Sequence, residues 1–459
     1  MPFSRSWIDD TLRVAGRGSA GVKGFADIVT DSRKVTPGCL FVAIKGDIHD
    51  GHDFLTQAVG QGAAGIMCDK GRGSSCEGKA VVYEVMNTLQ SYRVLGGAWR
   101  RQFTIPVAMV VGSVGKTTTK EFLAAMVEGH WDAVLKTSGS ENGYLGIPIT
   151  LLKLRSHHRA AVIEVGIDDV GAMAQHCPLV DPTVVVCTAV GPEHLEKLKT
   201  VEIAAQEELL ALRRSHAAGR PVVVNLDDPM IAPLAQELKG GEVVTFSLTT
   251  PGTKAKVADV LGAEADGGLV VGLKDGRSFR VTPPLPGVHQ VRNLLAAITT
   301  AVVMGLTPDE IRKGLSTFVP APGRTEVRTL KSGQTILCDH YNANPTSMEA
   351  AFVLLTDLWQ KAGSKGKRWA LLGDMLELGV DEEKFHRGLA RKLIDLGVEH
   401  IRLYGPRMIW LADELKSKAR HFATHEAMAA DVRSGLQPGD VLLLKGSRGM
   451  KMEQVLAAL

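Results

Sequence analysis

The stretch "IPVAMVVGSVGKTTTKEFLAAMVEGHW", residues 105–131, joins an apolar segment of strand length to a glycine-containing turn and an amphipathic helix. The expected helix has one apolar face, made of Phe122, Leu123, Met126 and Val127. Glycines in the turn let backbone N–H groups close around phosphate oxygens, and a helix N-terminus adds positive potential. The stretch therefore predicts a phosphate-binding loop between a strand and a helix.

The loop is shorter than the strict Walker pattern, because Val110 stands where that pattern has its first glycine. What remains is GxxGKTT, which argues against an ordinary P-loop GTPase or kinase. A lysine in this place reaches the β- and γ-phosphate oxygens, and the following threonine ligates magnesium through its hydroxyl. An incidental lysine at a strand–helix joint is the weaker alternative. The predicted ATP-binding residues of the loop are Gly112, Ser113, Val114, Gly115, Lys116, Thr117 and Thr118.

Bulk properties narrow the class of protein. A chain of 459 residues is too long for one hydrophobic core, so several domains are expected. The net charge of +3 is spread along the chain, with no basic block interleaved with aromatics, which argues against nucleic acid as the main partner. The six cysteines form no CxxC pair, so neither a zinc site nor a disulfide framework is indicated. We find no signal peptide and no apolar run of membrane length, and we expect a cytoplasmic protein.

Apolar strand-like segments alternate with helical ones, which is typical of an α/β protein with parallel sheets covered on both faces. Composition shifts and a Pro/Gly-containing stretch predict three domains, with boundaries at residues 1–99, 100–319 and 320–459. Three predicted strands of the last region end in polar residues, namely Asp339, Asp374 and Lys445. Ligands of parallel sheets bind at the carboxyl ends of strands, so these side chains are candidates for a site.

Several motifs together resemble the Mur ligases, a family of ATP-dependent amide-bond-forming enzymes of peptidoglycan synthesis. The central ones are GxxGKTT, "VIEVG" at 162–166, "GPEHLE" at 191–196 and "NLDDP" at 225–229. The stretch from "DSRKV" to "DGHDF", residues 31–54, is similar to the family's UDP-binding domain. "DHYNANPTSMEAA", "LLGDMLELG" and "KGSRGMKME" resemble the C-terminal domain of the member that adds D-Ala-D-Ala. The resemblance covers essentially the whole chain.

The resemblance implies a fold and a reaction. The fold has a smaller N-terminal α/β UDP-binding domain, a central parallel-sheet P-loop ATPase-like domain and a C-terminal Rossmann-like domain. With ATP and Mg2+, the terminal carboxylate of UDP-MurNAc-tripeptide becomes an acyl phosphate, which the amine of D-Ala-D-Ala attacks. A monomer is expected, with no nucleic acid and no membrane insertion. The third residue of the acceptor peptide, meso-diaminopimelate or lysine, is left open.

The resemblance also implies site residues. The catalytic residues are Lys116, Glu164, His194 and Glu208, and the metal ligands are Thr117, Glu164, His194 and Glu208. ATP is further contacted by His289, Asn293, Arg324 and Asp339. The substrate is contacted by Ser32, Arg33, Asp50, Gly51, His52, Asn142, Tyr341, Asn342 and Asn344.

Residue chemistry leaves alternatives for some of these positions. Asn293 can instead be the N-cap of a helix. Glu164 can be a surface carboxylate at a strand end, and His194 a loop histidine that binds nothing. "HDGHDF", residues 49–54, can be a polar turn or, less well, a metal site.

The chain departs from the family pattern where a carbamylated lysine usually helps to hold a second magnesium. An ungapped reading places Glu208 there, and Glu207 if the register slips by one. Our hypothesis is that the Glu208 carboxylate replaces the carbamate, since both are hard oxygen donors. The alternative is that both glutamates lie on a solvated helix face.

Three further departures bear on the choice of function. Only Asn142 survives of an asparagine-rich loop, Glu193 stands where a small residue or Asp is usual, and Gln290 replaces an asparagine. Two rival functions follow from the departures, a related ligase with a changed acceptor or amino acid and a nucleotide-binding pseudoenzyme that acts as a scaffold.

Overall fold

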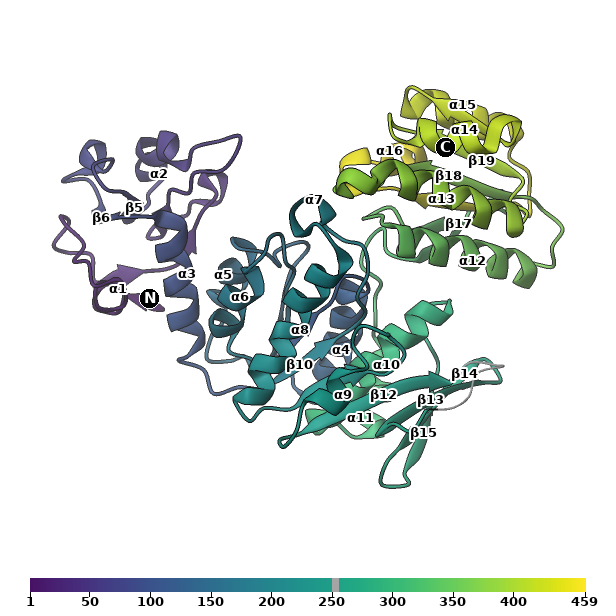
Figure 1. Ribbon diagram of the computed structural model, residues 1–459. Coiled ribbons are helices and arrows are strands. Elements are labelled where there is room, and N and C mark those ends of the chain that lie inside the picture. The colour runs from purple at the N-terminus through teal and green to yellow at the C-terminus, as the bar shows by residue number, and fades with distance from the viewer. Residues whose placement is uncertain (250–255) are drawn as a thin grey trace. The chain divides into compact units, whose positions relative to one another are not determined.

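The computed structural model describes residues 1–249 and 256–459 as a mixed α/β protein (Figure 1). The chain divides into two compact units. The first comprises residues 1–109, 132–165 and 174–182, and the second residues 110–131, 166–173 and 183–459. Within the described ranges, every helix is too short or too polar to span a lipid bilayer. The three predicted domain boundaries stay a prediction.

The first unit contains a four-stranded parallel sheet in the order β3-β4-β5-β6. Its strands are β3 (Ile28–Val29), β4 (Leu40–Val42), β5 (Gly65–Asp69) and β6 (Val81–Val85). A small antiparallel pair precedes it, β1 (Phe3–Ser4) with β2 (Gly24–Phe25). The helices of this part are α1 (Arg5–Leu12), α2 (Leu55–Gly60) and α3 (Thr88–Arg100). Apolar residues of β4, β5 and β6 form a core with α2, as the alternation of strands and helices predicts.

The remainder of the first unit belongs to a second sheet. It contains β8 (Val134–Lys136), β9 (Ala160–Glu164) and the first residues of β7 (Val107–Val111), with β9 between the other two. It also holds α5 (Gly146–Leu151) and most of α6 (Ala172–Val180). Every residue of β7 and β9 is buried, which explains why both read as uninterrupted apolar runs.

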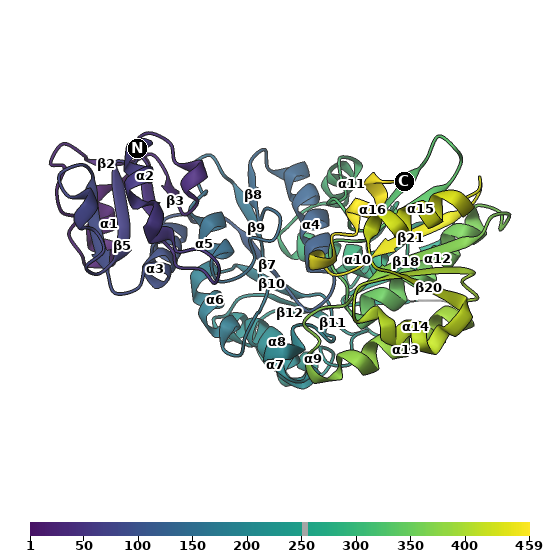
Figure 2. The same ribbon diagram turned by 90° about the horizontal axis from the view of Figure 1, so that it is seen from above.

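In the second unit the same sheet continues from β7 through parallel strands to an antiparallel end. The parallel strands are β10 (Val184–Cys187), β11 (Val222–Asn225), β12 (Val243–Thr249) and β13 (Val260–Ala265); β14 (Gly268–Leu273) and β15 (Ser278–Val281) are antiparallel. Its helices are α4 (Lys116–His130), α7 (Leu195–Leu198), α8 (Val201–Ala217), α9 (Leu234–Glu237), α10 (Val288–Val303) and α11 (Pro308–Ser316). Helices α10 and α8 cover opposite faces of the parallel strands (Figure 2).

The last sheet has the order β16-β17-β21-β18-β19-β20 and is parallel except for β16. Its strands are β16 (Glu326–Thr329), β17 (Thr335–Cys338), β18 (Arg368–Gly373), β19 (His400–Tyr404), β20 (Ala419–Phe422) and β21 (Val441–Lys445). One face packs on α12 (Pro345–Lys361), α13 (Glu382–Asp395) and α14 (Met408–Leu415). The other face packs on α15 (His425–Gly435) and α16 (Glu453–Ala457).

The sheet order brings the polar strand ends together. Strand β21 lies between β17 and β18, and all three run in the same direction. The ends of β17 and β21 place Asp339 and Lys445 next to each other, and Asp374 follows the end of β18. The predicted α/β class with parallel sheets is confirmed.

Candidate active site

The predicted phosphate loop lies between β7 and α4, as the sequence indicates. Gly112 and Gly115 have positive φ angles of 126° and 90°, which residues with a side chain rarely adopt. A Cβ at Gly112 would collide with the hydroxyl of Thr188, and one at Gly115 with the side-chain oxygen of Asn293. Ser113 donates its backbone N–H to the carbonyl of Ala189, 2.7 Å away. Both glycines are therefore needed for the close packing of this loop.

Lys116 begins α4, and its ammonium bends back over the loop. The Nζ atom donates to the carbonyl of Gly112 at 2.5 Å and to the carboxylate of Glu193 at 2.9 Å. The two side chains are about nine-tenths buried, 9% and 12% exposed. Thr117 and Thr118 are buried in the first turn of the same helix. The cation that is predicted to meet the ATP phosphates is thus held at the loop by an acidic side chain.

Glu208 reaches the loop from α8. Its Oε2 atom accepts the backbone N–H of Gly112 at 2.8 Å, and no hydrogen-bond partner lies near its buried Oε1 atom. Burial raises the pKa of Glu208 to about 7, although the nearby Lys116 ammonium acts in the opposite direction. Glu207 points elsewhere and accepts the backbone N–H of Gly171 at 2.9 Å. Glu208 is thus the glutamate at the phosphate loop, and the alternative of a solvated face is wrong for it.

His194 stands just before α7 and has a φ angle of 50°. Its Nδ1 atom is hydrogen-bonded to Glu377 at 2.5 Å, and its Nε2 atom lies 3.7 Å from Glu193. Burial alone would lower the pKa of His194, but these two carboxylates outweigh burial and raise it. The backbone N–H of Glu196 also donates to the carbonyl of Glu377. The His194 turn is therefore fastened to the segment that follows β18.

Glu164 ends β9 in the first unit, whereas Thr117, His194 and Glu208 belong to the second. It is buried, and its Oε1 atom accepts the side-chain N–H of Asn142 at 2.8 Å. The alternative of an exposed surface carboxylate is therefore wrong. In the part of the chain that the structure describes, no group of three or more His, Cys, Asp or Glu side chains is arranged to hold a metal.

Asn142 belongs to a loop that α3 holds in place. The buried guanidinium of Arg93 donates to the carbonyl of Tyr144 at 2.8 Å and lies 4.8 Å from the centre of its ring. The same guanidinium lies 3.2 Å from the Nδ1 atom of His176, whose pKa burial lowers to about 3. Arg93 thus supports the loop from which Asn142 reaches Glu164.

The predicted adenine contacts lie in α10. The N-cap of this helix is Gly287, so the alternative that Asn293 caps it is wrong. The amide oxygen of Asn293 packs on Gly115, and its Nδ2 atom donates to Gln290 at 3.1 Å. Burial lowers the pKa of His289 to about 4, so its ring is neutral near pH 7. The Asn293 side chain thus links the phosphate loop, through its contact with Gly115, to Gln290 in the same helix.

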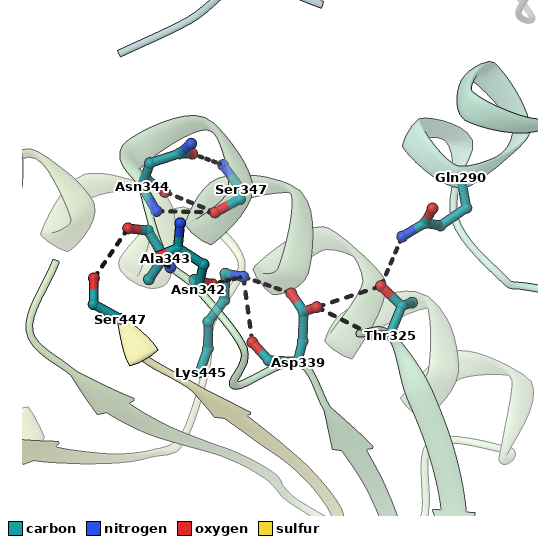
Figure 3. Close-up of polar contacts among 9 residues, drawn as sticks. All are labelled: Gln290, Thr325, Asp339, Asn342, Ala343, Asn344, Ser347, Lys445 and Ser447. Atoms are coloured by element: carbon teal, nitrogen blue, oxygen red, sulfur yellow. Dashed lines mark hydrogen bonds and ion pairs between the residues drawn. The ribbon is translucent and has the colours of Figure 1, made fainter. Parts of the chain in front are cut away.

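Arg324 and Asp339 lie in the segment between α11 and α12. The guanidinium carbon of Arg324 is 4.1 Å from the centre of the Tyr341 ring, and its buried Nε atom has no hydrogen-bond partner. Asp339 accepts from Lys445 at 2.6 Å and from the backbone N–H of Thr325 at 3.1 Å (Figure 3). Burial alone would raise the pKa of Asp339, but the Lys445 ammonium outweighs it and lowers the pKa.

The asparagines predicted to contact substrate have local structural roles as well. Asn344 caps α12, because its Oδ1 atom accepts the N–H of Ser347 and the Ser347 hydroxyl accepts the N–H of Asn344. The exposed Asn342 offers its carbonyl to Lys445 at 3.1 Å. An asparagine before a proline at a helix start is a known cap pattern, so the sequence carried a signal for this role.

The predicted UDP-binding residues form two separate turns in the first unit. The exposed Arg33 side chain forks onto Asp31 with two distances of 2.9 Å, which lowers the pKa of Asp31 to about 2. Ser32 begins the 3-10 turn that Asp31 caps. The charge of Arg33 is therefore balanced by its neighbour in the chain.

The second turn is built around the buried side chain of His52. Its Nδ1 atom lies 2.6 Å from Asp50, and its Nε2 atom accepts the backbone N–H of Asp69 at 2.9 Å. Arg72 donates to the other oxygen of Asp50 at 2.8 Å. A Cβ on Gly51 would lie 2.6 Å from the backbone nitrogen of Ile44. Both ring nitrogens of His52 are thus used inside the domain, which speaks against a metal there.

Comparison with known proteins agrees with this arrangement. Three family models match the chain, the Mur ligase family catalytic domain at residues 25–127, the Mur ligase middle domain at 110–301 and the Mur ligase glutamate ligase domain at 323–448.

Relatives match over nearly the whole chain. UDP-N-acetylmuramoyl-tripeptide–D-alanyl-D-alanine ligase of Bacillus subtilis is 31% identical over 93% of this chain and 92% of its own length. The ligases of the same name from Synechocystis and Escherichia coli are 32% and 30% identical, over 94% of this chain and 91% and 93% of theirs.

Solved structures with the same fold include MurF from Acinetobacter baumannii, with a TM-score of 0.87, 26% identity and coverage of 99% of this chain and 98% of that one. MurF ligase from Thermotoga maritima in complex with ADP has a TM-score of 0.79, 26% identity and coverage of 94% and 96%. The predicted fold class is confirmed. The chain belongs to the Mur ligase family.

Proposed function

We propose that this protein is an ATP-dependent ligase that joins D-Ala-D-Ala to UDP-MurNAc-tripeptide and so makes UDP-MurNAc-pentapeptide. The observation that carries the proposal is the loop between β7 and α4, where the buried Lys116 ammonium stands over backbone groups at a helix N-terminus. The relatives bearing that ligase name, aligned over more than nine-tenths of the chain, support the choice of substrates.

The reaction divides into two steps. In the first, the terminal carboxylate of the tripeptide attacks the γ-phosphorus of ATP, the bond to the β-phosphate oxygen breaks, and ADP leaves. In the second, the neutral amine of D-Ala-D-Ala attacks the acyl carbon, the amine proton is lost, and phosphate departs with one oxygen of the original carboxylate. Both steps gather negative charge on phosphoryl oxygens, and we propose that the Lys116 ammonium and the N-terminus of α4 stabilise this charge.

One observation supports a magnesium ion beside the loop. The buried Oε1 atom of Glu208 accepts no hydrogen bond. A hard carboxylate oxygen of this kind suits Mg2+. Thr117, His194 and Glu164 complete the proposed ligands, and the ion would offset charge on the phosphates. We further propose that the Glu208 carboxylate takes the place of the carbamylated lysine of other Mur ligases, so that this enzyme needs no bicarbonate.

The other predicted site residues are proposed to contact either ATP or the peptide substrates. His289, Asn293, Arg324 and Asp339 are proposed to surround ATP, and the Arg324 Nε atom without a partner supports this. The remaining proposed contacts to the UDP-linked peptide and the dipeptide are Ser32, Arg33, Asp50, Gly51, His52, Asn142, Tyr341, Asn342 and Asn344. We expect a monomer that works in the cytoplasm.

Phosphate release by the purified protein tests the proposal. The complete mixture contains ATP, Mg2+, UDP-MurNAc-tripeptide and D-Ala-D-Ala, and each component is left out in turn. Release that requires all four, together with a pentapeptide product, is the expected result. Tight ATP binding without any release would instead favour a changed acceptor or a scaffold protein, and a screen of alternative acceptors would separate those two.

A further inference from the structure

A chain of hydrogen bonds runs from Asn293, which packs on the phosphate loop, to the C-terminal sheet. Asn293 packs on Gly115 and donates to Gln290, and the Nε2 atom of Gln290 donates to the hydroxyl of Thr325 at 2.7 Å. The backbone N–H of Thr325 then donates to Asp339, which in turn accepts from Lys445 (Figure 3). Residues that are far apart in the sequence thus form one continuous network in the second unit.

The network crosses a turn with unusual backbone geometry. Thr325 has a φ angle of 51° and Gly323 one of 68°, and a β-branched residue is rarely found in this region. Thr325 is only 2% exposed, and Gln290 is 5% exposed. A buried residue in such a conformation persists because its surroundings hold it, and here both its N–H and its hydroxyl are held.

The length of the side chain at position 290 decides whether both hydrogen bonds of its amide can form. The glutamine amide spans from α10 to Thr325 while its oxygen accepts from Asn293. An asparagine at this position is one methylene shorter, so it cannot make both bonds from the same backbone. The length of the Gln290 side chain is therefore what allows one amide to link Asn293 with Thr325.

We infer that Gln290 is a positioning residue that couples the phosphate loop to Asp339 by holding Thr325. It does not touch the reacting atoms. It holds Thr325, and through Thr325 it holds Asp339 and the Lys445-bound loop at Asn342. The inference rests on the proposed function for its catalytic consequence, whereas the hydrogen-bond chain itself can be tested without any activity.

The test uses isosteric variants of the full-length protein. Gln290→Met and Thr325→Val each remove the bond with little change in volume, and Thr325→Ser keeps the hydroxyl. Thr300→Val is the matched control, because its buried hydroxyl donates within α10, to the carbonyl of Ala296. Gln290→Asn keeps the amide but shortens the side chain by one methylene, so it tests whether the length of the glutamine is needed.

We expect Gln290→Met, Gln290→Asn and Thr325→Val each to lower kcat about tenfold with less than threefold change in the Kd for ADP. The double variant Gln290→Met with Thr325→Val should lose less activity than the product of the two single losses, because both changes break the Gln290–Thr325 bond. Thr325→Ser and Thr300→Val should behave like the parent. Additive losses in the double variant, or a change below twofold in the single ones, would overturn the inference.

Amide hydrogen exchange separates this inference from the proposed function. In the ligand-free protein, the peptide that spans residues 323–340 should exchange faster in Gln290→Met and Thr325→Val than in the parent and in Thr300→Val. If the parent makes no pentapeptide but the two variants still exchange faster, the coupling stands and the function is rejected. Unchanged exchange would reject the coupling, whatever the activity.

Discussion

Replacing Glu193 by glutamine should strengthen the binding of metal-free nucleotide. The Glu193 carboxylate lies 2.9 Å from the Lys116 ammonium, in a place that is nine-tenths buried. The proposed ligand of the same ammonium is a phosphate oxygen. Nucleotide binding therefore puts two anions on one cation, and the substitution Glu193→Gln would remove one of these charges while it keeps the shape and an acceptor oxygen.

The size of the effect follows from the geometry. Two acceptors that share one tetrahedral ammonium at such distances lie roughly 4.5–5 Å apart. At an effective dielectric constant of about 20, their mutual repulsion is about 3.5 kcal/mol. Rotation of the Glu193 side chain away from the phosphate relieves part of it, so we expect a gain of about 1.4 kcal/mol, which is about tenfold in affinity.

Isothermal titration calorimetry with ADP in EDTA measures this gain. AMP serves as a second ligand, because it lacks the β-phosphate and its affinity should not change. Glu196→Gln is the matched control protein, since Glu196 is an exposed carboxylate three residues from Glu193 in the same turn. An ADP affinity of Glu193→Gln that equals or falls below that of the parent would refute the competition for Lys116.

Three further predictions concern other parts of the molecule. Glu208→Lys should make phosphate release depend on added bicarbonate, whereas release by the parent should not depend on it, because a lysine there must be carbamylated to provide a carboxylate. Equal dependence in both proteins would reject the proposal that Glu208 takes the place of the carbamylated lysine. Arg93→Met should lower the free energy of unfolding in urea by about 3 kcal/mol, since it strands buried acceptors, whereas the exposed Arg101→Met should not. Hydrogen bonds from the Thr307 backbone and from His130 lower the pKa of Glu310 to about 2. The stability that Glu310 gives α11 is therefore present above pH 4.5 and is lost as the pH falls toward 2, so Glu310→Gln should lower Tm at pH 7 and less at pH 3; a pH-independent difference would contradict this.

Much of the fold could be predicted because its strands are buried on both faces. Runs such as β7 and β10 read as apolar segments of strand length, and glycines or polar residues mark their ends. The phosphate loop followed from the order of strand, glycine turn and lysine. Motifs of this kind consist of consecutive residues, so they can be recognised directly in a sequence.

The long-range partners of the site could not be predicted in the same way. The sequence marks Glu193 only as a departure from the family pattern and Glu377 not at all, and the fold is needed to bring them to Lys116 and His194. Thr325 carries no motif, and its role depends on a positive φ angle that a sequence does not reveal. Lys445 was marked by its place at a strand end, but its bond to Asp339 depends on β17 and β21 being neighbours.

Transfer of oxygen-18 tests the proposed chemistry most directly. The terminal carboxylate of UDP-MurNAc-tripeptide is labelled with oxygen-18, and the phosphate released with ATP, Mg2+ and D-Ala-D-Ala is examined by mass spectrometry. An acyl-phosphate route predicts one labelled oxygen in each released phosphate and one in the new amide. Phosphate without any label would contradict the account, because the carboxylate would then never have carried the γ-phosphoryl group.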